Sequence, residues 1–351
     1  MIELELCPDS TLLVDGPASV WVESGIIEVF GAEKRAQSMT IVKENRRLPF
    51  YAIAPAKIKM RLGVDSTYTV KEGNTIPRSW IECADAIIKK TPPSVAIIGG
   101  NDSGKSSLGL YLINRCIRDG LDPVCFIDTD LGQSEIGPPG TIGFVILREQ
   151  TTDLQLMSPD WTMFLGVTSP YSVQKKVLSM AEKLLEKVKE RRARIIIMNT
   201  DGWVGNDEAL NYKRSIIGLL PSPLVIVITK DAELNPLLQS FSNDFIVVEP
   251  PLDVKPRSPE TRRRLRELIF AKYLKEGRIR VFRNDRVVFG KDWQNSMGRL
   301  IGLLGTDGKL LGIGVVVGID VKNGVLKVFT PVDEKVARVV IGGIRIERNG
   351  R

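Results

Sequence analysis

Apolar and polar positions change their spacing twice along this chain, and the first region reads as β structure. Residues 1 to 72 contain short apolar runs divided by turns, with Gly25 and Gly31 among the dividing residues. Short runs between frequent turns are typical of a small all-β unit. The strands expected here are Thr11–Val14, Ser19–Glu23, Ile26–Phe30, Thr40–Val42 and Phe50–Ile53.

The middle region, residues 73–277, alternates buried-type strands with stretches of helical periodicity. Pro77 begins a helix that runs through Ile88, and Thr91-Pro92-Pro93 ends it. Such alternation predicts a mostly parallel sheet with helices on both faces. The expected strands are Val95–Ile98, Val124–Asp128, Phe164–Val167, Ile195–Asn199, Leu224–Thr229 and Phe245–Glu249, and helices are expected at Val173–Arg192 and Arg214–Leu220.

The third region, residues 278–351, returns to β spacing. Asp307-Gly308 and Asn323-Gly324 stand between apolar runs and predict tight hairpin turns. The runs Val315–Val317 and Val325–Phe329 are the expected strands beside them. The sequence thus predicts three domains, with boundaries at 1–72, 73–277 and 278–351.

The most specific motif follows the first strand of the middle region, where GGNDSGKSS fits the pattern G-x-x-x-x-G-K-S. Glycines allow successive backbone amides to point at one anion in front of a helix N-terminus. Lys105 would reach the β- and γ-phosphates, and Ser106 would bind Mg²⁺. The alternative is a chance match in a glycine-containing turn. The residues expected to hold ATP are Gly99, Gly100, Asn101, Asp102, Ser103, Gly104, Lys105, Ser106 and Ser107.

With this loop, the predicted fold class is α/β: a central P-loop NTPase domain between two small β domains. A second strand then ends in the acidic sequence DTDLGQ. Asp128 occupies the strand end that normally faces a phosphate loop and steadies hydrated Mg²⁺. Asp130 is a candidate base for an attacking hydroxyl, and Gln133 follows it. The competing interpretation is an ordinary turn, since Asp, Gly and Ser favour turns.

Two further features bear on the substrate. Trp203 follows a buried strand at the sheet edge where such folds bind ligands, and its ring could stack on a base or pack in the core. The densest basic cluster is Thr261–Glu267, in which Arg262 and Arg266 share a helix face. Such a helix could act as a lid over a transferred phosphoryl group, or could be a solvated surface.

Composition excludes several other chemistries. The 351 residues include no histidine, which removes His bases, Ser-His-Asp triads and His-liganded metals. The four cysteines have no metal-binding spacing and predict reduced, mostly buried thiols in a cytoplasmic protein. No apolar run approaches the roughly 20 residues of a membrane helix, and no signal pattern begins the chain. The net charge of +7 suits either a polyanionic partner or a solvated basic surface.

Taken together, GGNDSGKSS, DTDLGQ, NTDGW and RSPETRRRLREL resemble the signature elements of the polynucleotide 5′-hydroxyl kinases. That family includes the kinase subunit of a pre-mRNA cleavage factor and a nucleolar pre-rRNA-processing kinase. SGIIEVFGAEK, IPRSWIE and FLGVTSP also look familial, so the resemblance covers most of the chain. It implies transfer of the γ-phosphate of ATP to the 5′-OH of RNA, sometimes of DNA.

The resemblance also implies roles for individual residues. Lys105 and Ser106 hold phosphates and Mg²⁺, and Asp130 is the base toward the 5′-hydroxyl; the division of labour between Asp128 and Asp130 stays open. Gln133 would lie near the metal, and Thr168 would order metal or substrate. The clasp on the terminal nucleotides would be formed by Thr200, Gly202 and Trp203. The lid arginines would be Arg262 and Arg266, with Arg263 as the alternative. The weaker contacts to the nucleotide base would come from Glu28 and Glu33.

Three functions compete. The first is an ATP- and Mg²⁺-dependent kinase of polynucleotide 5′-OH ends, and the second is an ATP-binding scaffold subunit of an RNA-processing complex. The third, a GTPase switch, lacks the N-K-x-D motif, because Thr229-Lys230-Asp231-Ala232 places Ala where Asp is needed. The sequence identifies no particular protein partner, oligomeric state or RNA pathway.

Overall fold

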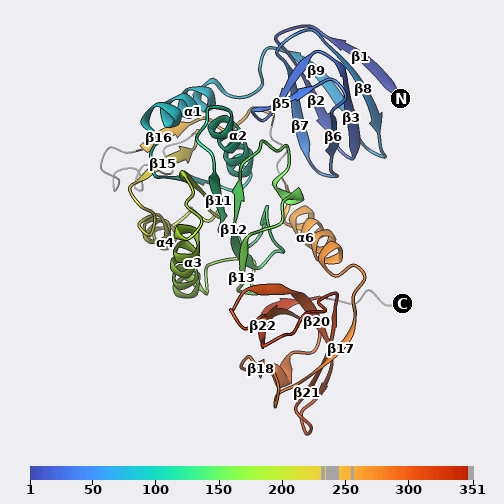
Figure 1. Ribbon diagram of the computed structural model, residues 1–351, viewed down its shortest axis with the longest axis vertical. Coiled ribbons are helices and arrows are strands. Elements are labelled where there is room, and N and C mark those ends of the chain that lie inside the picture. Colours follow the sequence, from blue (N-terminus) through green and yellow to red (C-terminus); the bar gives the residue numbers. More distant parts are fainter. Residues whose placement is uncertain (231–233, 235–244, 254–256, 347–351) are drawn as a thin grey trace.

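The computed structural model describes residues 1–230, 234, 245–253 and 257–346. Figure 1 shows three parts along the long axis: N-terminal strands at the top, a large sheet with helices in the middle, and C-terminal strands at the bottom. The large sheet is of mixed α/β type with mostly parallel strands, as expected. The division into three domains stays a prediction, and residues 347–351 lie outside the described residues.

The N-terminal part consists of two antiparallel sheets, in the orders β1-β8-β3-β6 and β5-β4-β7-β2-β9. Each of the five expected strands has a counterpart, and four further strands were missed. One of these, β8, alternates buried Ala56, Ile58 and Met60 with Lys and Arg, so the period-2 signal was present in the sequence. The strands are β1 (Ile2–Leu6), β2 (Ser10–Asp15), β3 (Ala18–Ser24), β4 (Ile26–Val29), β5 (Ala32–Arg35), β6 (Met39–Val42), β7 (Arg47–Ala52), β8 (Ala56–Leu62) and β9 (Tyr68–Glu72).

The central sheet has the order β13-β12-β11-β14-β10-β15-β16. From β11 to β16 all neighbours are parallel, whereas β12 and β13 add an antiparallel edge. The strands are β10 (Ser94–Gly99), β11 (Val124–Asp128), β12 (Thr141–Leu147), β13 (Trp161–Phe164), β14 (Ile195–Asn199), β15 (Pro223–Ile228) and β16 (Phe245–Val248).

Helices cover both faces of this sheet because alternate side chains of each strand point to opposite sides. On β10, Val95 and Ile97 pack in one core with helices α1 (Arg78–Lys90) and α2 (Lys105–Arg118). Ala96 and Ile98 pack in the other core with α3 (Gln174–Lys189) and α4 (Asp207–Ile217). The near-continuous apolar sequence of β10 is therefore that of a strand buried on both faces.

Two predictions in this region were wrong in detail. The strand expected at Phe164–Val167 is β13, Trp161–Phe164, which pairs with the unpredicted β12; Gly166 follows it with φ +73°. The helix expected at Arg214–Leu220 begins earlier, because the Asn206 side chain accepts a hydrogen bond from the amide of Ala209 and caps α4. The polar first turn of α4 concealed this start.

Helix α6 (Pro259–Tyr273) leads from the central part to the C-terminal sheet of order β17-β21-β20-β19-β22-β18. Gly308 (φ +82°) and Gly324 (φ +62°) lie in the two predicted hairpin turns. A short 3₁₀ turn, η1 (Leu154–Leu156), lies before β13 and another, η3 (Trp293–Asn295), before β19. The strands are β17 (Arg278–Arg283), β18 (Val288–Phe289), β19 (Arg299–Leu304), β20 (Leu310–Asp320), β21 (Val325–Thr330) and β22 (Arg338–Arg345).

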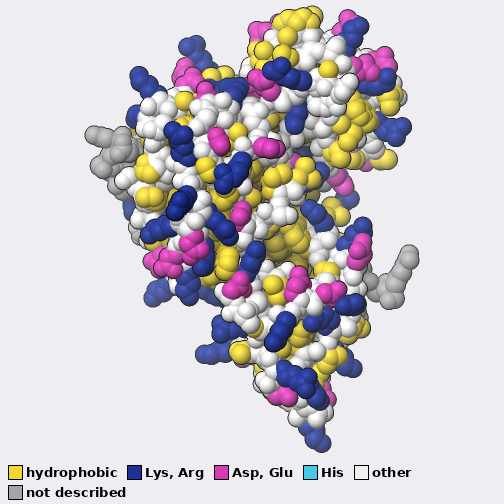
Figure 2. Space-filling model, viewed as in Figure 1, with side chains coloured by type: hydrophobic (Ala, Val, Ile, Leu, Met, Phe, Trp, Pro, Cys, Tyr) yellow, Lys and Arg dark blue, Asp and Glu magenta, His cyan; other side chains and the backbone are white. Residues whose placement is uncertain are grey.

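Surface and cysteine chemistry follow the expectations from composition. Cys83, Cys116 and Cys125 are buried, Cys7 is exposed, and all four are free. Within the described ranges, no helix is both long and apolar enough to cross a bilayer. Lys and Arg side chains are spread over the whole visible face in Figure 2 and are interspersed with acidic ones. On this face, the positive net charge therefore forms no single basic patch.

Candidate functional site

The phosphate loop lies between β10 and α2, and two of its glycines are required by its shape. A Cβ on Gly99 would lie 2.5 Å from Ser103 Oγ. Gly104 has φ +99°, and a Cβ there would lie 2.9 Å from Pro251. Only glycine fits both positions without rearrangement. The loop borders a cavity of about 770 Å³ through Asn101, Asp102, Gly104, Lys105, Ser106 and Ser107.

Lys105 is buried at the floor of this cavity. Its Nζ donates a hydrogen bond to the carbonyl oxygen of Gly100, 2.6 Å away. Burial lowers the pKa of Lys105 to about 8, against the opposing attraction of Asp130. Among the described residues, no carboxylate lies within ion-pair distance of this ammonium, a position in which an incoming phosphate would stabilise its charge.

The acidic segment after β11 separates its two aspartates. Asp128 is fully buried and accepts hydrogen bonds from the amides of Glu135 (2.6 Å) and Asp130 (3.1 Å). Burial, and then the charge of Asp130, raise the pKa of Asp128 to about 7. Asp130 lines the cavity, and its Oδ1 accepts from the amides of Gly132 (2.9 Å) and Gln133 (3.0 Å). Of the two carboxylates, Asp130 is the one a substrate in the cavity would meet.

The residues predicted to bind the metal supply oxygen donors. Ser106 and Gln133 line the cavity, and the Thr168 carbonyl oxygen lies against Gly132, where a Cβ would be 3.0 Å away. Asn199 adds a buried Oδ1 without a hydrogen-bond partner, while its Nδ2 donates to Asp128 (3.1 Å). Oxygen donors of this kind suit Mg²⁺. Among the described residues, no group of three His, Cys, Asp or Glu side chains forms a metal site of its own.

The arginine-rich helix α6 contacts the phosphate loop directly. Arg262 Nη2 lies 2.7 Å from Asp102 Oδ2, which also accepts the amide of Arg257 at 2.9 Å. Burial raises the pKa of the Asp102 carboxyl, but these hydrogen bonds outweigh it and hold the pKa below its usual value. Arg266 is half-buried on the same helix face, and burial lowers its pKa while Asp130 opposes the shift.

The alternative arginine points elsewhere. Arg263 is exposed and pairs with Glu267 along the helix at 3.0 Å. Of the lid candidates, Arg262 contacts the phosphate loop through Asp102, whereas Arg264 of the same helix lines the cavity; the choice of the lid pair stays a prediction. The Asp102 contact was not predicted, although an acidic residue inside the loop motif was the available signal.

The three predicted clasp residues differ in exposure. A Cβ on Gly202 would overlap the side-chain oxygen of Asn101, so the clasp backbone lies directly against the phosphate loop. Trp203 is half-buried between Tyr171 and Tyr212, with ring centroids 5.5 and 6.0 Å away. Thr200 is fully buried, and its hydroxyl donates to the Ile97 carbonyl oxygen at 2.8 Å. A direct contact of Thr200 with substrate does not fit this geometry, because its one donor already ties β14 to β10.

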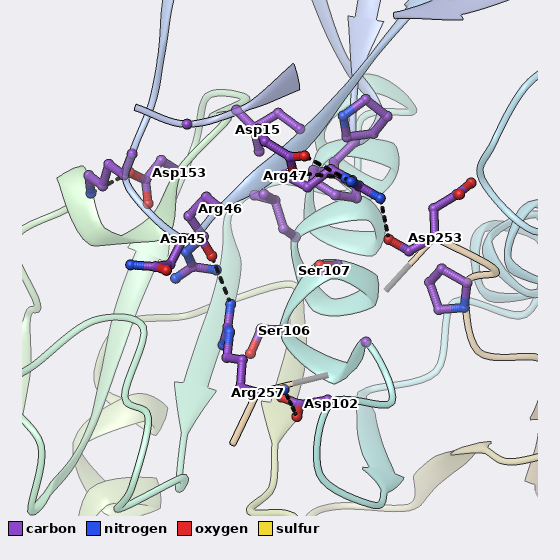
Figure 3. Close-up of a pocket in the computed structure, with 18 of the residues that line it drawn as sticks. Asp15, Asn45, Arg46, Arg47, Asp102, Ser106, Ser107, Asp153, Asp253 and Arg257 are labelled. Atoms are coloured by element: carbon purple, nitrogen blue, oxygen red, sulfur yellow. Dashed lines mark hydrogen bonds and ion pairs between the residues drawn. The ribbon is translucent and has the colours of Figure 1, made fainter. Parts of the chain in front are cut away.

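The N-terminal part contributes residues that sequence reasoning missed. Asn45, Arg46 and Arg47 line the same cavity as the phosphate loop. Figure 3 shows Arg257 between Asn45 and Ser106, while Arg47 is turned to Asp15 and Asp253. The available signal was the charged run KENRR between two apolar stretches. By contrast, neither of the weaker base-contact candidates lines the cavity: the Glu28 side chain pairs with Arg118 at 3.0 Å, and that of Glu33 pairs with Arg35 at 3.1 Å.

Arg46 connects this loop to the acidic segment. Its Nη2 lies 2.5 Å from Glu135 Oε2, and the amide of Glu135 donates to Asp128. Arg257 Nη1 donates to Gln133 Oε1 at 2.8 Å, so two guanidinium groups flank the segment that carries Asp130. The position of the acidic segment therefore depends on a residue from another part of the chain.

Comparison with known families decides which fold family carries this site. A family model described as the mRNA cleavage and polyadenylation factor CLP1 P-loop matches residues 99–276, just over half of the chain. The chain belongs to the CLP1 P-loop family. The matched segment contains the phosphate loop, the acidic segment, the clasp and helix α6.

Relatives within this family have informative names. The chain is 24% identical over 339 residues to a polyribonucleotide 5′-hydroxyl-kinase of Methanocaldococcus jannaschii, covering 78% of this chain and 93% of the relative. It is 25% identical over 337 residues to one from Pyrococcus horikoshii, covering 79% and 92%. The structure matches that of wild-type Clp1p in a Clp1p–Pcf11p complex with TM-score 0.81 at 17% identity, over 98% of this chain and 97% of that one. The last likeness confirms the α/β fold.

Proposed function

We propose that this protein is an ATP-dependent polynucleotide 5′-hydroxyl kinase, which transfers the γ-phosphate of ATP to the 5′-OH end of RNA, and in some settings DNA. The proposal rests on one observation: the phosphate loop and Asp130 border the same cavity, and Arg262 of α6 forms an ion pair with Asp102 of that loop. The archaeal relatives named polyribonucleotide 5′-hydroxyl-kinases support it, since they align over most of this chain. A cytoplasmic location is part of the same proposal.

In this proposal the loop residues 99–107 bind the triphosphate through backbone amides, and Lys105 neutralises the β- and γ-phosphates. Mg²⁺, held by Ser106 with Asp128, Gln133 and Thr168 close by, would add positive charge at the same oxygens. Asp128 takes this supporting role because it is fully buried and fixed by amide hydrogen bonds.

Asp130 is the base. It accepts the proton of the 5′-hydroxyl while the O5′–phosphorus bond forms and the bond from the γ-phosphorus to the bridging oxygen breaks, releasing ADP. Burial raises the pKa of Asp130 above its ordinary value, which makes its carboxylate a stronger base. Arg262 and Arg266 neutralise charge on the transferred group, and Trp203 and Gly202 hold the terminal nucleotide.

A transfer assay tests the proposal. Purified protein, ATP labelled at the γ-position, Mg²⁺ and a 5′-OH oligoribonucleotide should yield a labelled 5′ end. Lys105→Ala and Asp130→Asn should each abolish the product, while Asp285→Asn and Lys291→Ala in the C-terminal part, both exposed, serve as matched controls with unchanged rates. ATP binding without any transfer would instead support the alternative, an ATP-binding scaffold in an RNA-processing complex.

A further inference from the structure

Three aromatic rings form a series from the surface to the core beside the clasp. Tyr171 is 60% exposed, Trp203 is half-buried, and Tyr212 is buried. The rings of Tyr171 and Trp203 lie 5.5 Å apart at an angle of 79°, and those of Trp203 and Tyr212 lie 6.0 Å apart at 32°. The outer two rings thus form a nearly right-angled corner, and the innermost ring supports Trp203 from behind.

This corner lies beside two loops of the candidate site, outside the residues that line the cavity. Gly202, the neighbour of Trp203, packs against Asn101 of the phosphate loop. Tyr171 follows Thr168, whose carbonyl oxygen lies against Gly132 of the acidic segment. The two outer rings therefore come from segments that contact the phosphate loop and the acidic segment, the two parts of the chain on which the proposed phosphoryl transfer depends.

Hydrogen bonds hold the backbone at both residues, and the edge-to-face contact between the two rings orients Tyr171. The Trp203 amide donates to Asp201 Oδ1 at 2.9 Å, and the buried Lys213 Nζ lies 2.8 Å from Asp201 Oδ2. Gln174 Nε2 donates to the Tyr171 carbonyl oxygen (3.2 Å) and to Glu208 Oε1 (2.6 Å), which links the segment to α4. An exposed aromatic ring held by such contacts is already in position for a ligand, so little ordering entropy opposes binding.

Two lysines lie four and five residues after Tyr171, alongside the acidic Glu208, which accepts a hydrogen bond from Gln174. These lysines, Lys175 and Lys176, are exposed in the first turn of α3, and that turn contains no acidic residue. Aromatic rings beside cationic side chains are the usual elements of single-strand binding surfaces, because bases stack on the rings while cations contact the phosphates. The second base of a blunt duplex is already stacked on both faces, so it must leave that stack before it can lie on a side chain.

We propose that Tyr171 extends the clasp outward by one nucleotide: Trp203 contacts the terminal base of the acceptor, and Tyr171 stacks on the next one. The proposal rests on the kinase function proposed above. It makes the acceptor a single-stranded 5′ end of at least two nucleotides, with the second base unpaired. Tyr171 acts in binding and specificity, not in the chemical step.

The test measures transfer to three acceptors: a single-stranded 5′-OH oligoribonucleotide, the same strand lacking the second base, and a blunt duplex. With wild-type protein, removal of the second base should raise the KM for RNA by about 5- to 150-fold, the value of one stacked base, and leave kcat and the KM for ATP unchanged. The blunt duplex should be the poorer acceptor for the same reason.

Variants isolate the ring itself. Tyr171→Ala should raise the KM for the intact strand by a similar factor and remove the penalty for the missing base, whereas Tyr171→Phe should behave as wild type. Tyr68→Ala, at a tyrosine of β9 that is 37% exposed and belongs to the N-terminal sheet and not to the clasp, is the matched control with no effect. The proposal would be overturned if Tyr171→Ala left the KM for the intact strand unchanged. It would also be overturned if removal of the second base still raised the KM of this variant as much as that of the wild type. Either result would leave the kinase function intact. A wild-type protein that transfers nothing to any acceptor would refute the function itself.

Discussion

The two small β regions at the ends of this molecule differ in how they meet the central sheet. The N-terminal region places Asp15 and residues 43–49 along the cavity. The C-terminal region, in the part that the structure describes, supplies none of the cavity lining. The two regions are similar in size and β content, but among the described residues the N-terminal one lines the cavity and the C-terminal one does not.

Their contacts with the central part differ in chemistry as well. The N-terminal region makes charged contacts beside the cavity, Arg46 to Glu135 and Lys71 to Asp253, and it also packs Phe30 against the central core and Gly31 against Tyr111 of α2. The C-terminal region attaches through close packing, with Gly302 against the ring of Phe164 and the Gly343 amide bonded to the Gly166 carbonyl oxygen at 2.8 Å. Charged contacts beside a cavity indicate a part in binding, whereas close packing indicates mechanical support.

The largest effect that separates the two regions should come from Arg46→Ala. Without the guanidinium, Glu135 loses its partner and the segment holding Asp128 and Asp130 shifts, so kcat/KM for transfer should fall by about 100-fold. Thermal unfolding measured alongside should show that the variant is folded. Arg280→Ala, which removes comparable contacts to the carbonyl oxygens of Val332 and Glu334 in the C-terminal region, should leave transfer unchanged. An equal fall in kcat/KM in Arg46→Ala and Arg280→Ala would contradict the proposed difference between the two β regions.

The next largest effect is the pH dependence of nucleotide binding, which is expected to come from Lys105 in the cavity. Since burial lowers the pKa of Lys105 to about 8, its ammonium is present below that pH and is lost above it. Affinity for a non-hydrolysable ATP analogue should therefore fall as pH rises through 8, by up to tenfold per unit. Titration calorimetry from pH 8 to 9.5, above the pKa of about 7 of Asp128, measures this, and Lys105→Met should give a weaker and flat profile over the same range. A flat profile in the wild type would contradict the assignment.

In the C-terminal region, Gly302→Ala should affect stability and not chemistry. A Cβ there would lie 2.5 Å from the Phe164 ring, and overpacking of this kind costs about 1–3 kcal/mol. The melting temperature should fall, while the transfer rate per folded molecule stays the same. Gly318→Ala is the control, because its Cβ would meet only the flexible Lys327 side chain at 3.2 Å. A loss of transfer in folded Gly302→Ala would give the C-terminal region a part in the site.

The smallest effect is expected for Glu44→Gln in the N-terminal region. Glu44 and Arg264 lie 3.5 Å apart with side chains 50% and 73% exposed, and exposed ion pairs of this kind contribute little. Transfer should change by less than about threefold in the same labelled assay. A loss as large as that of Arg46→Ala would mean that this pair, and not the Arg46–Glu135 contact, couples the two parts.

The sequence predicted features that depend on local chemistry. Gly99 and Gly104 of the phosphate loop, the acidic strand end at Asp128 and the glycine turns of the C-terminal hairpins each follow from a few adjacent residues. The early start of α4 was missed because its first turn is polar, whereas β12 was missed although the seven residues TIGFVIL are apolar after Thr141 and interrupted only by Gly143. The antiparallel edge of the sheet could not be predicted either, because no local sequence pattern determines that β13 pairs with β12.

Contacts between distant segments were beyond prediction for a physical reason. The Arg46–Glu135 contact joins residues 89 positions apart, and the Asp102–Arg262 contact joins residues 160 apart. In the sequence, the charged residues of these two contacts cannot be told apart from charged residues on a solvated surface. Thr200 shows the converse, since a residue in a functional motif is fully buried and holds β14 to β10.

Product analysis of a single turnover tests the central claim most directly. Protein in excess over a 5′-OH oligoribonucleotide, with ATP and Mg²⁺, should convert the oligonucleotide to its 5′-monophosphate and form one ADP per strand, as read by mass spectrometry. ADP formed without a phosphorylated strand, or no ADP at all, would contradict the claim that this cavity transfers a phosphoryl group to a polynucleotide end.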